Sequence, residues 1–147
     1  MEREATVVGT TASSVDPYGG HPSRLVDGKG LNGVWVYESV GPTVCAQDVG
    51  QDPKWFSLEL EVPHIVTKVQ LAKRMESQTE GQGRCVTISV GSSAQYDPNE
   101  ALCRPQIAEL QHTSGLVDYP CTSNQETGRF VKISKSGCAD NLGTILF

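Results

Sequence analysis

Alternation of apolar and polar residues is the clearest pattern in this chain. Between residues 55 and 62 (WFSLELEV), Phe56, Leu58, Leu60 and Val62 alternate with mostly polar neighbours. A period of two residues is typical of a β-strand that buries one face and exposes the other. We therefore predict a strand over residues 55–62, with these four apolar side chains directed into a core.

Several shorter segments repeat this pattern and are separated by Gly- and Pro-rich turns. The further predicted strands are 5–8 (ATVV), 64–74 (HIVTKVQLAKR), 85–91 (CVTISVG), 129–134 (RFVKIS) and 143–147 (GTILF). Only residues 99–110 (NEALCRPQIAEL) have helical character, and Pro105 limits a helix there to about one turn. Short strands at this density predict an all-β sandwich or barrel.

Length and charge restrict the classes of protein to consider. The chain has 147 residues, which suits one domain over residues 1–147. The formal net charge is −5 and there is no run of Lys or Arg, so we expect no nucleic-acid partner. No apolar stretch is long enough for a transmembrane segment, and the first residues (MEREATVVGT) lack the apolar region of a signal peptide.

The five cysteines, taken alone, leave two interpretations open. None of them forms a C-x-x-C pair, so the spacing of a zinc finger is absent. An extracellular protein with disulfides would leave one thiol over, whereas a cytosolic protein could carry five free thiols. Of the two, we favour the extracellular interpretation.

Motifs for catalysis are absent from the sequence. His21, His64 and His112 lie in turn-like segments and are not spaced as paired metal ligands, and no G-x-S-x-G motif occurs. The acidic residues are scattered, so their spacing nominates no acid and base pair. We therefore expect that the protein is not an enzyme.

The order of several short motifs resembles that of the F-type lectins, a family of fucose-binding proteins. The matching motifs are Ala12-Ser13-Ser14, Tyr18-Gly19-Gly20, Val26-Asp27-Gly28, residues 52–74, ISVGSS, Cys103, Cys121 and GRFVKIS. The resemblance covers nearly the whole chain and implies a single jelly-roll-like β-sandwich of the eight-stranded type. Discoidin-like domains of coagulation factors share this sandwich and several of the motifs, so they remain the alternative.

The resemblance also implies a sugar site whose motif is altered in this chain. The family places a His, 26 residues, Arg-x-Asp, four residues, and then Arg or Lys, which donate hydrogen bonds to fucose. Here Gln47 stands in the place of the His, and Arg74 is the one residue that is unchanged. The remaining sugar-binding candidates are Glu76, Gln82 and the nearby Arg84.

The segment from residue 29 to 43 is longer than the corresponding loop of the family. It carries Trp35 and Tyr37, which are candidates for a contact with a glycan or a protein receptor, although packing against the sandwich would also explain them. A protein-binding module on the same fold is therefore one alternative function. A discoidin-like cell-surface or membrane adhesion domain is another, but its loops would carry exposed apolar and basic residues, whereas these loops are polar or acidic.

Calcium and disulfides are the remaining implications of the resemblance. Asp27 matches a calcium-binding position, but Lys29 follows where an Asn is usual, and Leu146-Phe147 replace a Cys-Glu pair. Since calcium prefers oxygen ligands, we expect a site that is absent or weak. The family pairs its cysteines at the positions of Cys103 and Cys121, and Cys45 would pair with Cys138 or Cys85, or stay free. The resemblance thus implies a secreted module that recognises a glycan or glycoprotein.

Overall fold

The structure is a computed structural model that describes residues 5–13, 46–48, 54–73, 84–110, 117–122, 126–135 and 142–146. The described residues form strands β1 (Val7–Ala12), β2 (Ala46–Asp48), β3 (Lys54–Val66), β4 (Lys68–Lys73), β5 (Arg84–Gly91), β6 (Ala101–Glu109), β7 (Val117–Pro120), β8 (Glu126–Lys135) and β9 (Leu142–Leu146). Within this part of the chain there is no helix that could cross a membrane.

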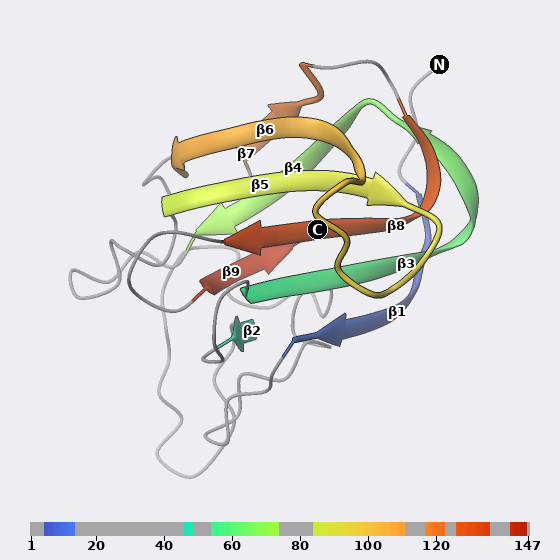
Figure 1. The fold of residues 1–147 in the computed structure, drawn as a ribbon, viewed down its shortest axis with the longest axis horizontal. Coiled ribbons are helices and arrows are strands. Elements are labelled where there is room, and N and C mark those ends of the chain that lie inside the picture. The colour runs from blue at the N-terminus through green and yellow to red at the C-terminus, as the bar shows by residue number, and fades with distance from the viewer. Residues whose placement is uncertain are drawn as a thin grey trace, which may run out of the picture.

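The strands form two antiparallel sheets that pack face to face. One sheet has the order β1-β3-β8-β5-β6 and lies in front in Figure 1, whereas the other has the order β2-β9-β4-β7 and lies behind it. Strands that follow one another in the sequence are mostly not neighbours, so most pairings join distant segments. The predicted all-β, jelly-roll-like sandwich is therefore confirmed.

The core is made by the apolar faces that the alternation predicts. The front sheet contributes Phe56, Leu58, Leu60, Val86, Ile88, Val90, Val131 and Ile133, and the back sheet contributes Val69, Leu71 and Tyr119. All of these side chains are buried. Burying a large apolar side chain stabilises the fold by about 1.5–3 kcal/mol, so this cluster is the main source of stability.

The predicted burial of Val62 is wrong, because this side chain is 52% exposed. The pairing of β3 with β8 shifts register between Glu59 and His64, where β3 carries more residues than β8 between two paired positions. A bulge of this kind breaks the alternation of buried and exposed positions. The two strands predicted over residues 55–62 and 64–74 also divide at a different residue. β3 continues past Pro63 as far as Val66, and the break between the strands lies at Thr67.

The helical character expected for residues 99–110 is also wrong, since residues 101–109 form β6. This strand is at the edge of the front sheet, where the missing N–H of Pro105 does not interrupt an interior ladder. Its pairing with β5 shifts between Val86 and Ile88, and again between Ile88 and Ser89. β6 has an extra residue at each shift, and these bulges obscured the strand period in the sequence.

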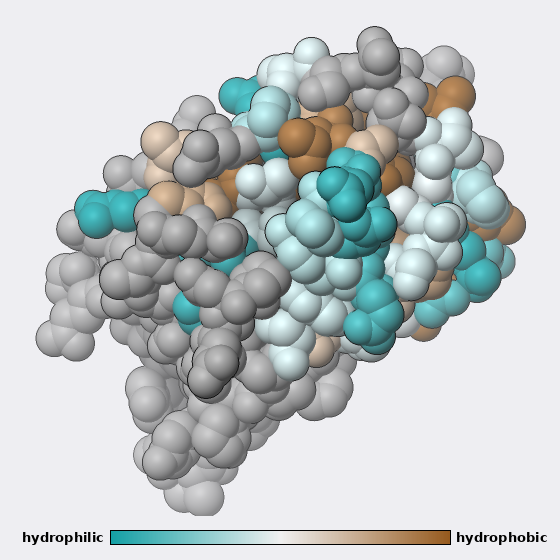
Figure 2. All heavy atoms as spheres, viewed as in Figure 1, coloured by the Kyte–Doolittle hydropathy of each residue, from teal (hydrophilic) through white to brown (hydrophobic). Residues whose placement is uncertain are grey.

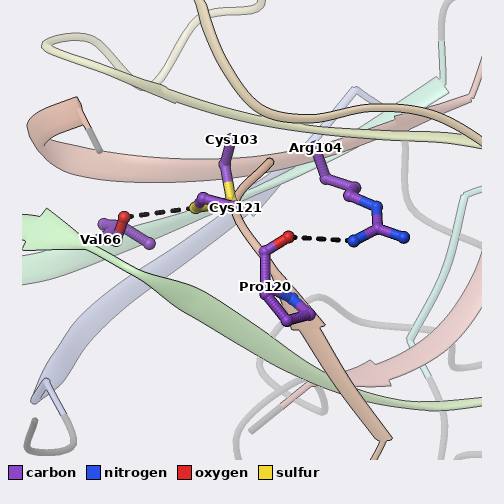
Figure 3. The surroundings of a disulfide bond; sticks show 5 residues. All are labelled: Val66, Cys103, Arg104, Pro120 and Cys121. Carbon is purple, nitrogen blue, oxygen red and sulfur yellow. Dashed lines mark hydrogen bonds between the residues drawn. A yellow bond between two sulfur atoms is a disulfide. The ribbon is translucent and has the colours of Figure 1, made fainter. Parts of the chain in front are cut away.

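A disulfide between Cys103 and Cys121, the pair implied by the resemblance, joins the two sheets (Figure 3). Cys103 lies in β6 and is fully buried, and Cys121 directly follows β7. Two backbone hydrogen bonds flank the bridge, from the Cys121 N–H to the Thr67 carbonyl and from the Thr122 N–H to the Cys103 carbonyl, each 2.8 Å long. The Arg104 guanidinium donates to the Pro120 carbonyl at 3.2 Å, so covalent and polar contacts together hold the edges of the sheets.

Figure 3 also marks a close approach between the Cys121 sulfur and the Val66 carbonyl oxygen, which lie 3.2 Å apart. A sulfur in a disulfide carries no hydrogen, so it donates no hydrogen bond here. The approach shows how closely the end of β3 packs against the bridge.

The outer face of the front sheet contains a buried ion pair. The Lys132 side chain is 0% exposed, although Lys132 lies between Val131 and Ile133 and is directed away from the core. Its Nζ contacts Oε1 of Glu100, and the Ser89 hydroxyl donates to Oε2 of the same carboxylate at 3.3 Å. Segment 92–100 folds over the sheet and brings this carboxylate to the lysine (Figure 1).

Gly91 makes room for this carboxylate. A Cβ at residue 91 would lie 2.3 Å from Oε1 of Glu100, which is closer than any real contact of this kind. Ser57, on the strand next to Lys132, is also buried, and its hydroxyl has no hydrogen-bond partner within the described part of the chain. The ion pair is thus surrounded by small residues that let the segment approach the sheet.

An exposed ion pair in the back sheet provides a comparison. Asp118 in β7 accepts hydrogen bonds from Gln70 Nε2 at 2.7 Å and from Lys68 Nζ at 3.2 Å. These two hydrogen bonds, that of Gln70 first, lower the pKa of the Asp118 carboxyl. Both ionic side chains of this pair are substantially exposed, so solvent screens their attraction.

We predict that replacing both Cys103 and Cys121 by Ala lowers the free energy of unfolding by about 3 kcal/mol. The bridge closes a loop with a sequence separation of 18 residues, so its loss gives the unfolded chain more conformational freedom. Chemical denaturation of the variant and of the parent protein under oxidising conditions measures the difference. Equal stabilities, or recovery of both cysteines as free thiols in the parent, would contradict the prediction.

We predict that Lys132→Met lowers the free energy of unfolding by about 3–5 kcal/mol, because it leaves the Glu100 carboxylate buried without its cation. The double variant Lys132→Met/Glu100→Leu should recover most of the loss, since no buried charge then remains. Lys68→Met is the matched control, and removal of that exposed pair should change stability by less than about 1 kcal/mol. Urea denaturation of the four proteins tests this, and similar losses for Lys132→Met and Lys68→Met would refute it.

Candidate functional site

The structure gives a position in the fold to the first of the predicted sugar-binding residues. Gln47 lies in β2, where it pairs with Gly143 of β9. The next residue of β9, Thr144, pairs with Ala46 on one side and with Lys73, the last residue of β4, on the other. Gln47 and the end of β4 therefore pair with adjacent residues of β9, Gly143 and Thr144, and so lie at nearly the same height along the strands of the back sheet.

Arg74 follows Lys73 directly in the sequence and lies outside the described residues, as do Glu76 and Gln82. Their assignment to a sugar site thus remains a prediction. What the structure adds is the path of the chain as far as Lys73. The strand that precedes Arg74 ends one register step from the pairing of Gln47 with Gly143.

Arg84 belongs to the other sheet. It is the first residue of β5, is exposed, and pairs with Glu109 of β6. In Figure 1 the start of β5 and the end of β4 lie at the same end of the sandwich. The described candidates therefore share one end of the molecule, but they come from separate sheets.

Cys85, next to Arg84, has two features that fix the backbone at this end. It takes part in a disulfide bond, and its φ of 55° lies in the left-handed region that residues other than glycine seldom adopt. Cys103 and Cys121 are already paired with each other. Of the pairings predicted for Cys45, one with Cys138 would leave Cys85 without a partner, whereas a pair with Cys85, or a free Cys45, agrees with this disulfide. Cys45 and Cys138 themselves lie outside the described residues.

Two lysines at this end were missed by the sequence analysis. Lys54 begins β3, Lys135 ends β8, and the two residues are paired in register. Both side chains are buried, and both interact with other residues. The alternation of each strand could have predicted their burial. Lys54 lies on the same face of β3 as the core residue Phe56, and Lys135 lies on the same face of β8 as the core residue Ile133.

The remaining predicted residues lie outside the described part of the chain. These are Asp27, Trp35, Tyr37 and Phe147, so neither the calcium-binding loop nor the contact loop is described. Leu146 is the last residue of β9 and pairs with Leu71. No group of three or more His, Cys, Asp or Glu residues within the described ranges is placed to hold a metal ion.

Solved structures with a similar fold are lectins and carbohydrate-binding modules. A fucolectin from striped bass (Morone saxatilis) serum superposes with a TM-score of 0.71 and 22% identity, over 92% of this chain and 42% of that lectin. The CBM32 of AlyQ, solved in complex with 4,5-unsaturated mannuronic acid, gives a TM-score of 0.68 and 21% identity over 99% of this chain and 98% of that module. This chain has the fucolectin fold.

A third structure that is similar to this chain is a fucose-binding module from Streptococcus pneumoniae. Its TM-score is 0.65, with 23% identity over 95% of this chain and 89% of that module. No protein-family model and no curated protein sequence matches the chain. The likeness to these structures is therefore one of fold, and the ligand has to be argued from the residues of this chain.

Proposed function

We propose that the protein is an extracellular carbohydrate-recognition module that binds fucose-type glycans through the loops next to β2 and β4. The observation that carries this proposal is the position of β9, which pairs with both β2 and β4 and brings Gln47 level with the end of β4. The similar structures support it, since they include a fucolectin and a fucose-binding module.

In this proposal each side chain has a separate role in binding the sugar. The Gln47 amide can both donate and accept hydrogen bonds, and the Arg74 guanidinium donates to neighbouring hydroxyls. Glu76 orients Arg74, while Gln82 or Arg84 takes the place of the second guanidinium of the family. Loss of one charge-assisted hydrogen bond weakens binding by roughly 1.5–3 kcal/mol, which is on the order of 10- to 100-fold in affinity.

The proposed module has no catalytic role of its own. The similar structures are mostly lectins and carbohydrate-binding modules, although one of them, a truncated AlyQ, also contains an alginate lyase domain. The Cys103–Cys121 disulfide is consistent with an oxidising, extracellular environment. A protein receptor that contacts Trp35 and Tyr37 is the alternative that the following experiments can distinguish.

We predict that free fucose binds weakly or not detectably to the wild-type protein, because too few donors remain to satisfy its hydroxyls. Isothermal titration calorimetry with fucose measures this directly. A glycan array screened with wild type and Arg74→Ala then shows whether a larger glycan uses the same site, since its signals should disappear in the variant. Tight, stoichiometric binding of fucose would contradict the prediction that the wild-type protein has little affinity for the free sugar. Array signals that survive Arg74→Ala would contradict the site.

The double variant Gln47→His/Gln82→Arg should bind fucose more tightly than wild type, by on the order of 10- to 100-fold, because it restores two donors of the family motif. The same titration measures the gain, and Gln78→Arg serves as a control for an added charge in the same loop. If the double variant gains nothing while a protein or another glycan binds the wild type, the site has been adapted to a different ligand.

We further predict that calcium does not stabilise the protein appreciably. Lys29 and the Leu146-Phe147 end replace side chains that could supply oxygen ligands, and Asp27 would mainly shape its turn. Thermal denaturation with added calcium and with a chelator should give the same melting temperature. A rise of several degrees with calcium that the chelator reverses would mean that backbone carbonyls form a working site.

A further inference from the structure

A cavity lies on the outer face of the front sheet, between segment 92–100 and strands β5 and β6. Its volume is about 390 Å³, which lies within the range of roughly 300–1,000 Å³ that is typical of ligand pockets. Residues of β5 and β8 line it from the sheet, and residues 96–98 line it from the segment above. Gln47 and β4 belong to the other sheet, whereas Arg84, another candidate of the proposed fucose site, precedes Cys85, which lines this cavity.

The wall of the cavity is held in place by the buried ion pair. Glu100, at the end of segment 92–100, is bound to both Lys132 and Ser89. The segment is also shaped by its own hydrogen bonds, from the Asn99 N–H to Asp97 Oδ1 at 2.8 Å and from the Glu100 N–H to the Asp97 carbonyl at 3.2 Å. A ligand would therefore meet a cavity that is already formed, and little ordering would oppose its binding.

The lining combines an apolar side with hydroxyl groups. Tyr96, Pro98, Leu102 and Pro105 provide the apolar side, and Leu102 is 38% exposed although it is a large hydrophobic residue. Figure 2 looks onto this face and shows polar side chains where the segment crosses the sheet, with apolar ones beside them over β6. Ligand binding would cover the exposed part of Leu102.

The polar side of the lining offers several hydrogen-bonding groups. Thr87 and Ser134 present hydroxyls, which both donate and accept, and the Asp97 carboxylate accepts. The Ser134 hydroxyl makes only a long hydrogen bond of 3.5 Å to the Thr87 carbonyl, so its oxygen can still accept from a ligand. None of the described lining residues is basic, and the net charge of the chain is −5, both of which disfavour an anionic ligand.

We propose that this cavity is a second saccharide-binding site, which takes one neutral sugar unit of a glycan. A sugar ring has an apolar face that fits against Tyr96 and Leu102, and an edge of hydroxyls that fits the polar side of the lining. A uronic acid is disfavoured by repulsion from Asp97. The inference does not depend on the fucose site, because it uses none of the residues of that site.

The test is a titration of the assigned ¹⁵N-labelled protein with methyl β-galactoside, methyl α-mannoside and N-acetylglucosamine, followed by NMR. At least one of these neutral sugars should shift the amide signals of Thr87, Asp97 and Ser134. Tyr96→Ala should weaken that binding by about tenfold, through the lost contact with the ring. Gln95→Ala, a change in the same segment at a residue that does not line the cavity, should leave the affinity within about twofold of wild type.

Two further measurements keep the test independent of folding and of the fucose site. Asp97→Asn retains the oxygen that accepts from the Asn99 N–H and should weaken neutral sugars while removing the repulsion of glucuronate. Arg74→Ala should leave the shifts at the cavity unchanged, so failure at one site is distinguishable from failure at the other. The proposal is overturned if no neutral sugar shifts these amides, if Tyr96→Ala binds as wild type does, or if glucuronate or a proline-rich peptide binds the cavity more tightly.

Discussion

A lysine in the middle of a sheet, with none of its side chain exposed, requires a carboxylate nearby. Lys132 is in this position, because β8 has the hydrophobic core on one side and segment 92–100 on the other. An unpaired ammonium there would be strongly destabilising, so the segment has to end with Glu100 over the sheet. The path of the segment, the space left open by Gly91 and the cavity beside β5 all follow from this requirement.

The disulfide has a comparable influence on β6 and β7, the neighbouring edge strands of the two sheets. β6 is an edge strand with bulges and a proline, features that weaken its pairing with β5. Cys103 sits within this irregular part and ties it to the end of β7. A strand whose hydrogen-bond ladder is interrupted twice is thus also held by a covalent bond to the other sheet.

Alternation in the sequence predicted the buried faces of β3, β5 and β8 well, because those faces contact one continuous core. It did not predict the exposure of Val62, where a bulge changes which side chains face the core. It also did not predict the burial of Lys132. An alternating pattern reports which residues share a face, but it does not report what covers that face. β2 and β7 are three and four residues long and are defined by their partners in the sheet, so no periodic signal marks them.

The candidate site was less predictable than the fold. The resemblance gave Gln47 a role, but its position level with Lys73 depends on β9, which is distant from both in the sequence. Lys54 and Lys135 follow the alternation of their strands, yet a charged residue at a core-facing position is normally assigned to solvent. The cavity beside segment 92–100 could not be predicted, since it arises where a segment without regular structure lies against β5 and β8.

The position of β9 has a consequence for the order in which the protein becomes functional during synthesis. β2 and β4 are not neighbours in the back sheet, and their shared neighbour β9 is the last strand of this sequence. A chain that leaves the ribosome with its N-terminus first exposes β2 and β4 long before β9 can pair with them. The sugar site proposed here would then be assembled only after the β9 residues have emerged, because without β9 nothing in the back sheet joins β2 to β4.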